Sequence, residues 1–147
     1  MPKTYNSVWI HLIFSTKNRE ELLTKSIRNQ LCEFLRNESV LKGYHLDSIN
    51  GYQNHIHILY KQTLSRPISE SAKWFKGRSS KWINETFELS SDFRWQQGYG
   101  VFSVSRENLE KVRNYIYHQE KIHKSRSFSD EFKMFMKEDE VELNRFI

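Results

Sequence analysis

The sequence predicts an α+β sandwich of ferredoxin-like type, with an antiparallel sheet and helices packed on one of its faces. Short segments rich in apolar and β-branched residues are typical of strands, and longer segments between them repeat apolar residues at helical spacing. The order is strand, helix, strand, strand, helix, strand, helix, which favours helices packed on one sheet. Without a repeat or a Pro/Gly-rich linker, residues 1–147 are expected to form one domain, with a core over about 5–120 and an extension over 121–147.

The first half of the chain contains three of the predicted strands and one helix. Residues 6–15 are dense in Val, Trp, Ile, Leu and Phe, which favours a strand at the centre of the sheet. A polar exit leads to a predicted helix over residues 20–38, where apolar residues recur at helical spacing. Residues 44–49 and 55–60 predict two further strands, one on either side of the turn-rich residues 50–54.

The second half supplies the remaining helices and the last strand. Residues 68–87 keep one apolar face and predict a second helix, and residues 99–104 predict the fourth strand. Ser105 is of a type that favours the N-cap position, so a third helix is expected over about 106–118. A shorter helix over about 129–136 is expected to be capped by the serine with which it begins.

The composition limits the kind of protein and its compartment. Lys and Arg number 23 against 18 Asp and Glu, and the resulting charge of +5 suits a polyanionic partner without requiring one. No apolar segment approaches the length that spans a bilayer, and the first residues lack the apolar stretch of a signal peptide. The single cysteine, Cys32, excludes an internal disulfide framework and a multi-cysteine zinc site. We therefore expect a cytoplasmic protein that is not attached to a membrane.

Two histidines in the third predicted strand form a candidate metal site. Successive side chains of a strand point to opposite faces, so His55 and His57 share one face while Ile56 and Ile58 share the other. Two imidazoles this close are suited to bind one metal ion. A pair of half-exposed histidines on a solvated face would show the same pattern, and the spacing alone does not separate the two interpretations.

The third predicted helix offers a candidate nucleophile and a candidate third ligand near its end. Tyr115 and Gln119 are four residues apart and lie on one helix face, whereas Tyr117 lies on roughly the opposite side. A divalent ion held by imidazoles and an amide oxygen would polarise a phosphodiester, and a tyrosine can attack it to form a covalent phosphotyrosine. Aromatic packing beside a surface glutamine is the alternative interpretation of this spacing.

The second predicted helix carries a basic segment, residues 73–82, whose lysines can line one side. Basic groups and hydroxyls suit contacts to phosphate, and Trp74 could stack on a base. A solvated helix face whose aromatic residues belong to the core would have the same sequence. Two further cations after the first strand could extend the basic surface. The residues that we predict to contact nucleic acid are Lys17, Arg19, Lys73, Lys76, Arg78, Ser79 and Lys81.

Five segments, taken in order, resemble one family of enzymes. Among them are the His-Ile-His sequence of the third predicted strand and a Tyr-Ile-Tyr-His-Gln sequence, which is similar to a Tyr-Ile-x-x-Gln motif. In this order the segments resemble the single-tyrosine HUH transposases (TnpA type) of small insertion sequences and their relatives linked to repetitive palindromes. Each motif alone is weak, but five in the expected order are a strong signal. They lie at residues 13–19, 54–59, 76–80, 95–104 and 115–119.

The resemblance implies a transposase that cuts and rejoins single-stranded DNA at ends bearing imperfect hairpins, through a 5′-phosphotyrosine. Tyr115 would be the nucleophile, and His55, His57 and Gln119 would hold a divalent ion, magnesium or manganese. The resemblance also implies a ferredoxin-like fold and a homodimer whose active sites are completed in trans. Such a protein would work in the cytoplasm of a bacterium or archaeon and be associated with the nucleoid at most.

Two other functions remain open from the sequence. A domesticated, non-mobile relative could bind hairpins of repetitive palindromes without cutting them, although a binding protein would need neither the histidines nor the tyrosine. An unrelated metallohydrolase could use His55 and His57 to hold zinc. That function would leave Tyr115 without a role, and the sequence shows no acidic ligand beside the two histidines.

Overall fold

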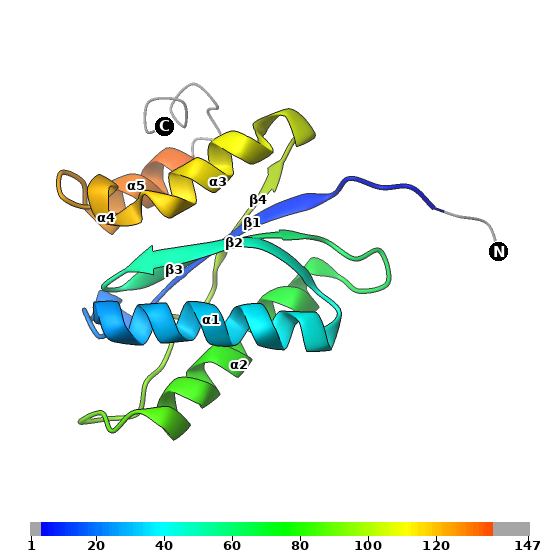
Figure 1. The fold of residues 1–147 in the computed structure, drawn as a ribbon. Coiled ribbons are helices and arrows are strands. Elements are labelled where there is room, and N and C mark those ends of the chain that lie inside the picture. The colour runs from blue at the N-terminus through cyan, green and yellow to red at the C-terminus, as the bar shows by residue number, and fades with distance from the viewer. Residues whose placement is uncertain (1–3, 137–147) are drawn as a thin grey trace.

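A four-stranded antiparallel sheet forms the centre of the molecule (Figure 1). The computed structural model describes residues 4–136, so residues 1–3 and 137–147 of the predicted domain lie outside the described residues. The strand order is β2-β3-β1-β4, which places the first strand between two partners, as its apolar composition predicts. The strands are β1 (Trp9–Ser15), β2 (His45–Tyr52), β3 (His55–Lys61) and β4 (Gly100–Val104).

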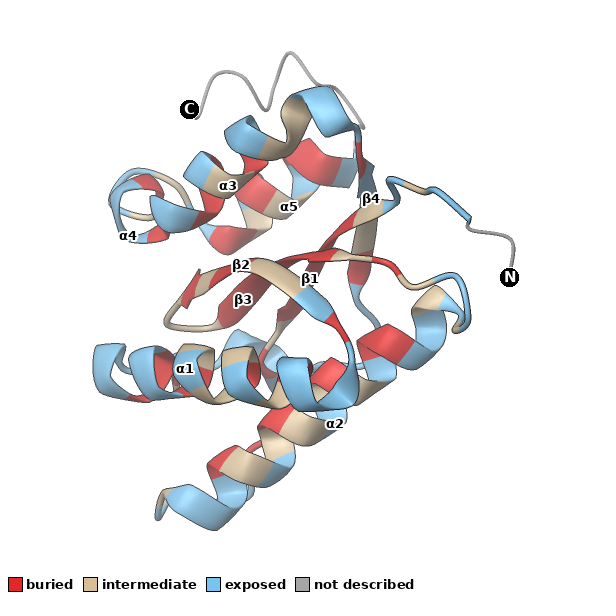
Figure 2. Ribbon diagram, turned by 45° about the vertical axis from the view of Figure 1, so that its right-hand side comes forward, coloured by how far each residue is buried: buried red, intermediate tan, exposed pale blue. Residues whose placement is uncertain are grey.

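Helices cover this sheet in two layers (Figure 1; Figure 2). α1 (Lys25–Lys42) and α2 (Ile68–Thr86) pack on one face, which confirms the predicted ferredoxin-like sandwich of an antiparallel sheet and helices. The C-terminal part adds a layer on the opposite face, made of α3 (Leu109–Tyr117), α4 (Gln119–Ile122) and α5 (Phe128–Met136). Within the described residues, no helix is both long and apolar enough to cross a membrane.

The two central strands are buried on both of their faces. Leu12 of β1 and Ile58 of β3 point into the core under α1 and α2. Ile13 and Leu59, one residue further along the same strands, point into a second core under α3 and α5. Because neighbouring residues of a strand point to opposite faces, every second position belongs to the same core. The histidines of β1 and β3 fall on the face that the C-terminal helices cover.

The first helix begins and ends later than predicted. It was expected over residues 20–38, and it runs over Lys25–Lys42. The Oγ of Thr24 accepts a hydrogen bond of 3.3 Å from the N–H of Ile27 and so caps the first turn. Gly43 ends the helix in the left-handed conformation, with a φ of 89°, which glycine adopts without steric cost. Apolar spacing marks the middle of this helix, whereas these two caps set its ends.

The third predicted helix, over residues 106–118, is divided into shorter pieces. A 3₁₀ turn, η2 (Arg106–Asn108), precedes α3, and the chain leaves helical geometry at His118 before α4 begins. Ser105 precedes the 3₁₀ turn, but its side chain makes no capping hydrogen bond. The expectation of one continuous helix capped by this serine is therefore wrong.

The last described helix is capped by a different serine from the one predicted. α5 begins at Phe128, so Ser129 lies inside the helix. Ser127 takes the capping role, because its Oγ accepts a hydrogen bond of 3.2 Å from the N–H of Asp130. A shift of two residues in the cap is a common error when several serines lie close together.

Two backbones approach closely in the hairpin between β2 and β3. β2 extends to Tyr52, so the turn is shorter than the predicted residues 50–54. A Cβ at Gly51 would lie 2.2 Å from the carbonyl oxygen of His55, and no side chain fits at that distance. This glycine lets β2 continue to the point where His55 begins β3 and so helps to place the candidate metal ligand.

Candidate active site

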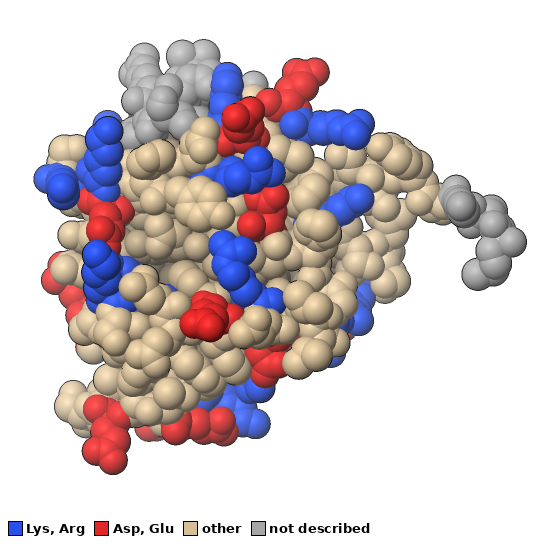
Figure 3. Space-filling model, viewed as in Figure 1, with Lys and Arg blue, Asp and Glu red and all other residues tan. Residues whose placement is uncertain are grey.

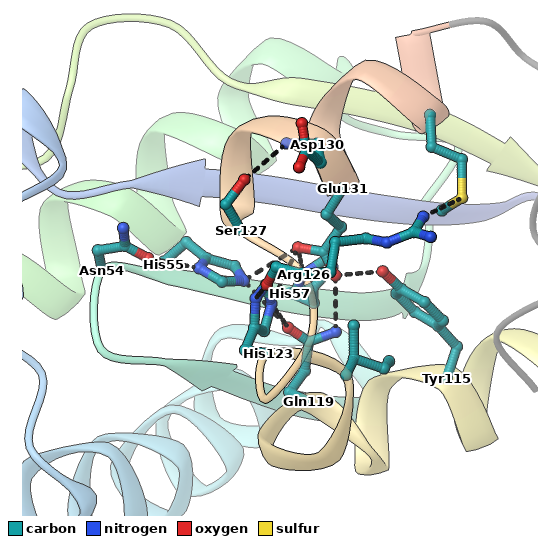
Figure 4. A network of polar contacts seen from close by, with 12 residues as sticks. Asn54, His55, His57, Tyr115, Gln119, His123, Arg126, Ser127, Asp130 and Glu131 are labelled. Carbon is teal, nitrogen blue, oxygen red and sulfur yellow. Dashed lines mark hydrogen bonds and ion pairs between the residues drawn. The ribbon is translucent and has the colours of Figure 1, made fainter.

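His55 and His57 point to the same face of β3, as predicted, and both side chains are fully buried. Figure 4 shows both imidazoles turned towards a carboxylate that α5 contributes. The Nε2 atom of each histidine lies 3.1 Å from Oε1 of Glu131. Their burial excludes the alternative interpretation of half-exposed surface histidines.

Glu131 connects the histidine pair to the candidate nucleophile (Figure 4). Its side chain is fully buried. Its Oε2 accepts a hydrogen bond from the phenol of Tyr115 and another, of 3.0 Å, from Nε2 of Gln119. Tyr115 and Gln119 therefore meet at one carboxylate although the helix is interrupted between them. Tyr117, on the other side of α3, is exposed.

The amide oxygen of Gln119 faces the imidazoles. Its Oε1 lies 3.0 Å from Nε2 of His55 and 3.0 Å from Nε2 of His123. The same Nε2 of His123 lies 3.3 Å from Oε1 of Glu131, and the other ring nitrogen lies 2.8 Å from the carbonyl oxygen of Arg126. The residue predicted as third ligand is thus next to the first histidine of the pair.

The imidazole of His11, on the neighbouring strand β1, contacts the imidazole of His57. Nε2 of His11, a buried residue of β1, lies 2.8 Å from Nδ1 of His57. When a histidine presents the lone pair of Nε2 to an ion, its Nδ1 carries the hydrogen and donates it to such a partner. Burial, and secondarily the neighbouring imidazole, hold the pKa of His11 well below its ordinary value, so it is neutral and able to accept.

Burial keeps His55 neutral while the carboxylate of Glu131 remains charged. Burial lowers the pKa of His55 to about 4, against the opposing influence of Glu131. Burial alone would raise the pKa of Glu131, but His57, His123 and His55 outweigh it and hold that pKa well below its usual range. Burial and the charge of Glu131 raise the pKa of Tyr115. At neutral pH His11 and His55 are therefore neutral, the carboxyl group of Glu131 is charged and the phenol of Tyr115 is neutral.

This donor set fits a divalent cation. Donor atoms of His55, His57 and Glu131 lie within 4.8 Å of one another, and all three side chains are buried. Imidazole nitrogen and carboxylate oxygen are common ligands of divalent ions, and neutral imidazoles have the free lone pair that binding requires. An acidic side chain, which the sequence did not show beside the histidines, is thus supplied by α5.

α5 closes the site. The ring of Phe128 stacks on the imidazole of His55, with 4.3 Å between ring centroids, and the ring of Phe135 lies 5.4 Å from that of Tyr115. The candidate nucleophile and its polar partners are fully buried. In this arrangement α5 separates the side chain of Tyr115 from solvent.

Three residues of this group were not predicted from the sequence, namely His11, His123 and Glu131. His123 follows Gln119 by four residues, the same spacing that links Gln119 to Tyr115, so it could have been found. His11 carries the weaker signal of a polar residue inside an apolar strand. Glu131 has no such signal, because its contact with the histidines depends on how α5 packs on the sheet.

The basic residues predicted on α2 lie on the opposite side of the sheet from this group. Lys73, Arg78 and Lys81 line a groove of about 530 Å³ on the outer surface of the helix. Both lysines are exposed, whereas Arg78 forms an ion pair with Glu38 of α1. Trp74 packs against the core and also lines this groove.

Two other predicted DNA contacts on α2 are engaged within the protein. Nζ of Lys76 donates to the carbonyl oxygens of Gln96, at 2.7 Å, and Gly98, at 2.9 Å, and so holds the loop before β4. Ser79 is fully buried, and its Oγ donates to a carbonyl of its own helix and accepts from Nε1 of Trp95 at 2.9 Å. The buried hydroxyl of Ser79 therefore has its partners inside the protein and does not face a phosphate.

Of the two DNA contacts predicted after β1, Arg19 lies next to the candidate site. Lys17 and Arg19 are exposed in a short 3₁₀ turn, η1 (Lys17–Arg19). Arg19 lines a cavity of about 530 Å³, and its guanidinium lies 5.2 Å from the ring centroid of Phe128. The same phenylalanine ring stacks on His55, so this cavity adjoins the histidine pair.

The surface charge does not gather in one place on the face seen in Figure 3. Lys and Arg side chains alternate there with Asp and Glu side chains. The formal charge of +5 therefore does not by itself identify which surface binds DNA, and the positions of the individual side chains are needed as well.

Sequence comparisons relate the chain to transposases. The profile of a family described as "Transposase IS200 like" matches residues 4–119. The ISDra2 transposase TnpA of Deinococcus radiodurans is 24% identical to the chain over 111 residues, which make up 72% of this chain and 79% of that protein.

Two solved structures share the fold. One is a crystal structure of a Deinococcus radiodurans R1 protein assigned as a transposase, with a TM-score of 0.65 and 24% identity, covering 81% of this chain and 98% of that one. The other is a REP-associated tyrosine transposase bound to a REP hairpin, with a TM-score of 0.58 and 14% identity, covering 84% of this chain and 74% of that one. At these identities the likeness concerns the fold.

Proposed function

The chain belongs to the IS200-like transposase family, and on this basis we propose that it cuts and rejoins single-stranded DNA through a covalent tyrosine intermediate. The observation that carries the proposal is the convergence of Tyr115, Gln119 and the histidine pair on the carboxylate of Glu131. A phenol this close to candidate metal ligands is suited to attack a phosphate held beside them.

Tyr115 is the proposed nucleophile. Its oxygen attacks phosphorus, so that a new O–P bond forms while the bond to the 3′-oxygen breaks, leaving a 5′-phosphotyrosine and a free 3′-hydroxyl. The phosphotyrosine conserves the energy of the broken bond, so a 3′-hydroxyl at a second junction can attack it and restore a diester. Attack requires loss of the phenol proton, which the raised pKa of Tyr115 disfavours. Oε2 of Glu131, which accepts the hydrogen bond of the phenol, is placed to take this proton, and the departing 3′-oxygen gains a proton to become the hydroxyl.

His55, His57 and Gln119 are the proposed ligands of a divalent ion, magnesium or manganese. When bound, such an ion polarises the phosphate and offsets the negative charge that develops in the transition state. The low pKa of His55 leaves its lone pair available at neutral pH. The contact with His11 fixes the orientation of the second imidazole.

The proposed substrate is single-stranded DNA with imperfect hairpins. A structural relative was solved with a REP hairpin, which supports this substrate class. Arg19 adjoins the site and, together with Lys17 of the same turn, is a proposed contact near the cut strand. The exposed lysines of the α2 groove offer a second surface. Lys76 and Ser79, which are bonded within the protein, would support these surfaces from inside.

One chain brings together the residues that the resemblance assigned to two subunits. The rings of Tyr115 and His57 lie 5.8 Å apart within a single chain. We therefore propose that the closed site forms in cis, whether or not the protein is a homodimer. A mixture of the Tyr115→Phe and His57→Ala variants should then form no adduct with DNA. Recovery of adduct formation on mixing would instead support sites completed in trans.

Replacement of the nucleophile tests the proposed function. Wild-type protein incubated with a labelled, hairpin-bearing single strand and MnCl₂ or MgCl₂ should give a covalent protein–DNA band on a denaturing gel. Tyr115→Phe should abolish this band, whereas Tyr117→Phe, on the exposed side of α3, should retain it. A strong band with Tyr115→Phe would reject the assignment of the nucleophile.

The same assay separates cutting from binding alone. If no palindromic strand is cut, and hairpin affinity is equal with and without the metal ion, the chain would be a non-mobile relative that only binds hairpins. Metal-dependent cutting by the wild-type protein would reject that alternative.

A further inference from the structure

Four donor atoms in the candidate site form a closed ring. Nε2 of His55 lies 3.0 Å from Oε1 of Gln119, which lies 3.0 Å from Nε2 of His123. That nitrogen lies 3.3 Å from Oε1 of Glu131, which in turn lies 3.1 Å from Nε2 of His55. Nε2 of His57 joins the ring from one side, at 3.1 Å from the same carboxylate oxygen.

These spacings are those of ligands that surround one cation. Ligands about 2.1 Å from an octahedral ion lie about 3.0 Å from their neighbours in the coordination shell. Each step around the ring lies between 3.0 and 3.3 Å. No large movement of the side chains is therefore needed to place an ion between them.

Hydrogen bonds alone cannot give every donor atom of this ring a good partner. Nε2 of His55 has two acceptor oxygens as neighbours, one from Gln119 and one from Glu131, and so does Nε2 of His123. A ring nitrogen carries at most one hydrogen, so each imidazole can point it well at only one of its two oxygens. A cation that accepts lone pairs from all four atoms satisfies them together.

We infer that His123 and Glu131 are further ligands of the divalent cation, in addition to His55, His57 and Gln119. The inference rests on the proposed function for the presence of the ion and adds ligands that the resemblance does not supply. The added ligands come from the end of α4 and from α5, whereas the histidine pair comes from β3. The ion therefore ties the C-terminal helices to the sheet.

Titration of metal-free, full-length protein with Mn²⁺ tests the assignment, with the electron paramagnetic resonance signal of free aqueous Mn²⁺ as the readout. His123→Ala and Glu131→Gln should each weaken Mn²⁺ binding by at least about tenfold, the lower end of the loss caused by removing an outer partner of a metal site. His118→Ala and Asp130→Asn are matched controls on exposed residues of similar chemistry and should bind as the wild type does. Circular dichroism without metal identifies the variants that fold.

Hydrogen exchange of the wild-type protein gives a second readout that needs no substitution in α5. Mn²⁺ should slow amide exchange in α4 and α5, because the bound ion holds both helices on the sheet. His55→Ala should remove this protection. Unchanged exchange in α4 and α5 on Mn²⁺ binding to the wild type would overturn the inference. Wild-type affinity in folded His123→Ala and Glu131→Gln would overturn it equally.

Failure of this inference and failure of the proposed function give different results. If His55→Ala abolishes Mn²⁺ binding while folded His123→Ala and Glu131→Gln keep it, the inference is rejected and the proposed site stands with fewer ligands. If the wild-type protein binds no Mn²⁺ or Mg²⁺, the ion of the proposed function is lost as well.

Discussion

The two faces of the central strands differ in what they bury. Leu12 and Ile58 of β1 and β3 lie in an apolar core under α1 and α2. On the other face, His11, His55 and His57 are buried as completely. The C-terminal helices cover this face of the sheet (Figure 2). A single step along a strand separates a residue that fills volume from a residue that needs a polar partner.

This difference separates the sources of stability and of chemistry. Apolar residues of the first face contribute through burial, which depends on area and packing. Buried imidazoles contribute only while they are hydrogen-bonded, and the carboxylate of Glu131 meets that need for both histidines of the pair. Substitutions at neighbouring positions of β3 should therefore have separable effects.

Ile58→Ala should give the largest loss of stability. The side chain is fully buried in the apolar core, so its truncation leaves a cavity that lowers the free energy of unfolding by about 2–5 kcal/mol. Urea denaturation followed by circular dichroism measures this loss. Folded Ile58→Ala should bind Mn²⁺ as the wild type does. A weaker affinity would contradict the proposal that the two faces of the sheet have separate roles in stability and in metal binding.

His57→Ala, one residue away, should act mainly on metal binding. Loss of a direct ligand should weaken Mn²⁺ binding by more than about 100-fold, the upper end of what loss of an outer partner causes. Isothermal titration calorimetry of the metal-free protein measures the affinity. Retained affinity in a folded His57→Ala variant would contradict the role of this histidine.

Acid should destabilise the metal-free protein through the polar face. The pKa of His55 is about 4 in the fold and 6.5 when the imidazole is unperturbed, so the unfolded chain takes up the proton more readily. The free energy of unfolding is therefore highest above about pH 6.5 and falls as the pH drops towards 4, by up to about 3 kcal/mol. Glu131 acts in the same direction, because its pKa is also lowered in the fold.

Urea midpoints at about pH 7.5 and about pH 4.5 check this dependence. The exposed His118 supplies the control, since His118→Ala should show the same difference between the two midpoints as the wild type. Equal midpoints at both pH values in the wild type would show that the buried imidazoles do not carry the linkage.

Local periodicity was enough to predict most of the site. Strand alternation placed His55 and His57 on one face, and helical spacing brought Tyr115 and Gln119 to one point. The position of the two histidines needs only the geometry of one strand. Tyr115 and Gln119 were expected on one continuous helix, and they still meet at Glu131 although α3 and α4 are separated at His118. The central position of the first strand and the helix layer on the first face followed from the same kind of signal.

The features that periodicity did not predict depend on caps and on tertiary packing. The ends of α1 are set by Thr24 and Gly43 rather than by the apolar pattern. The second helix layer, and with it Glu131, depends on how α5 folds back over the sheet. A glutamate in an amphipathic C-terminal segment resembles any solvated residue until that packing is known.

Identification of the amino acid that becomes linked to DNA is the most direct test of the proposed nucleophile. Cleavage by trypsin after Arg113 and Lys121 releases residues 114–121, a peptide that contains both Tyr115 and Tyr117. After nuclease digestion of the bound DNA, tandem mass spectrometry locates the phosphate within this peptide. We expect a phosphotyrosine at Tyr115 and an unmodified Tyr117. A phosphate on Tyr117 or elsewhere in the chain, with Tyr115 unmodified, would contradict the proposed nucleophile.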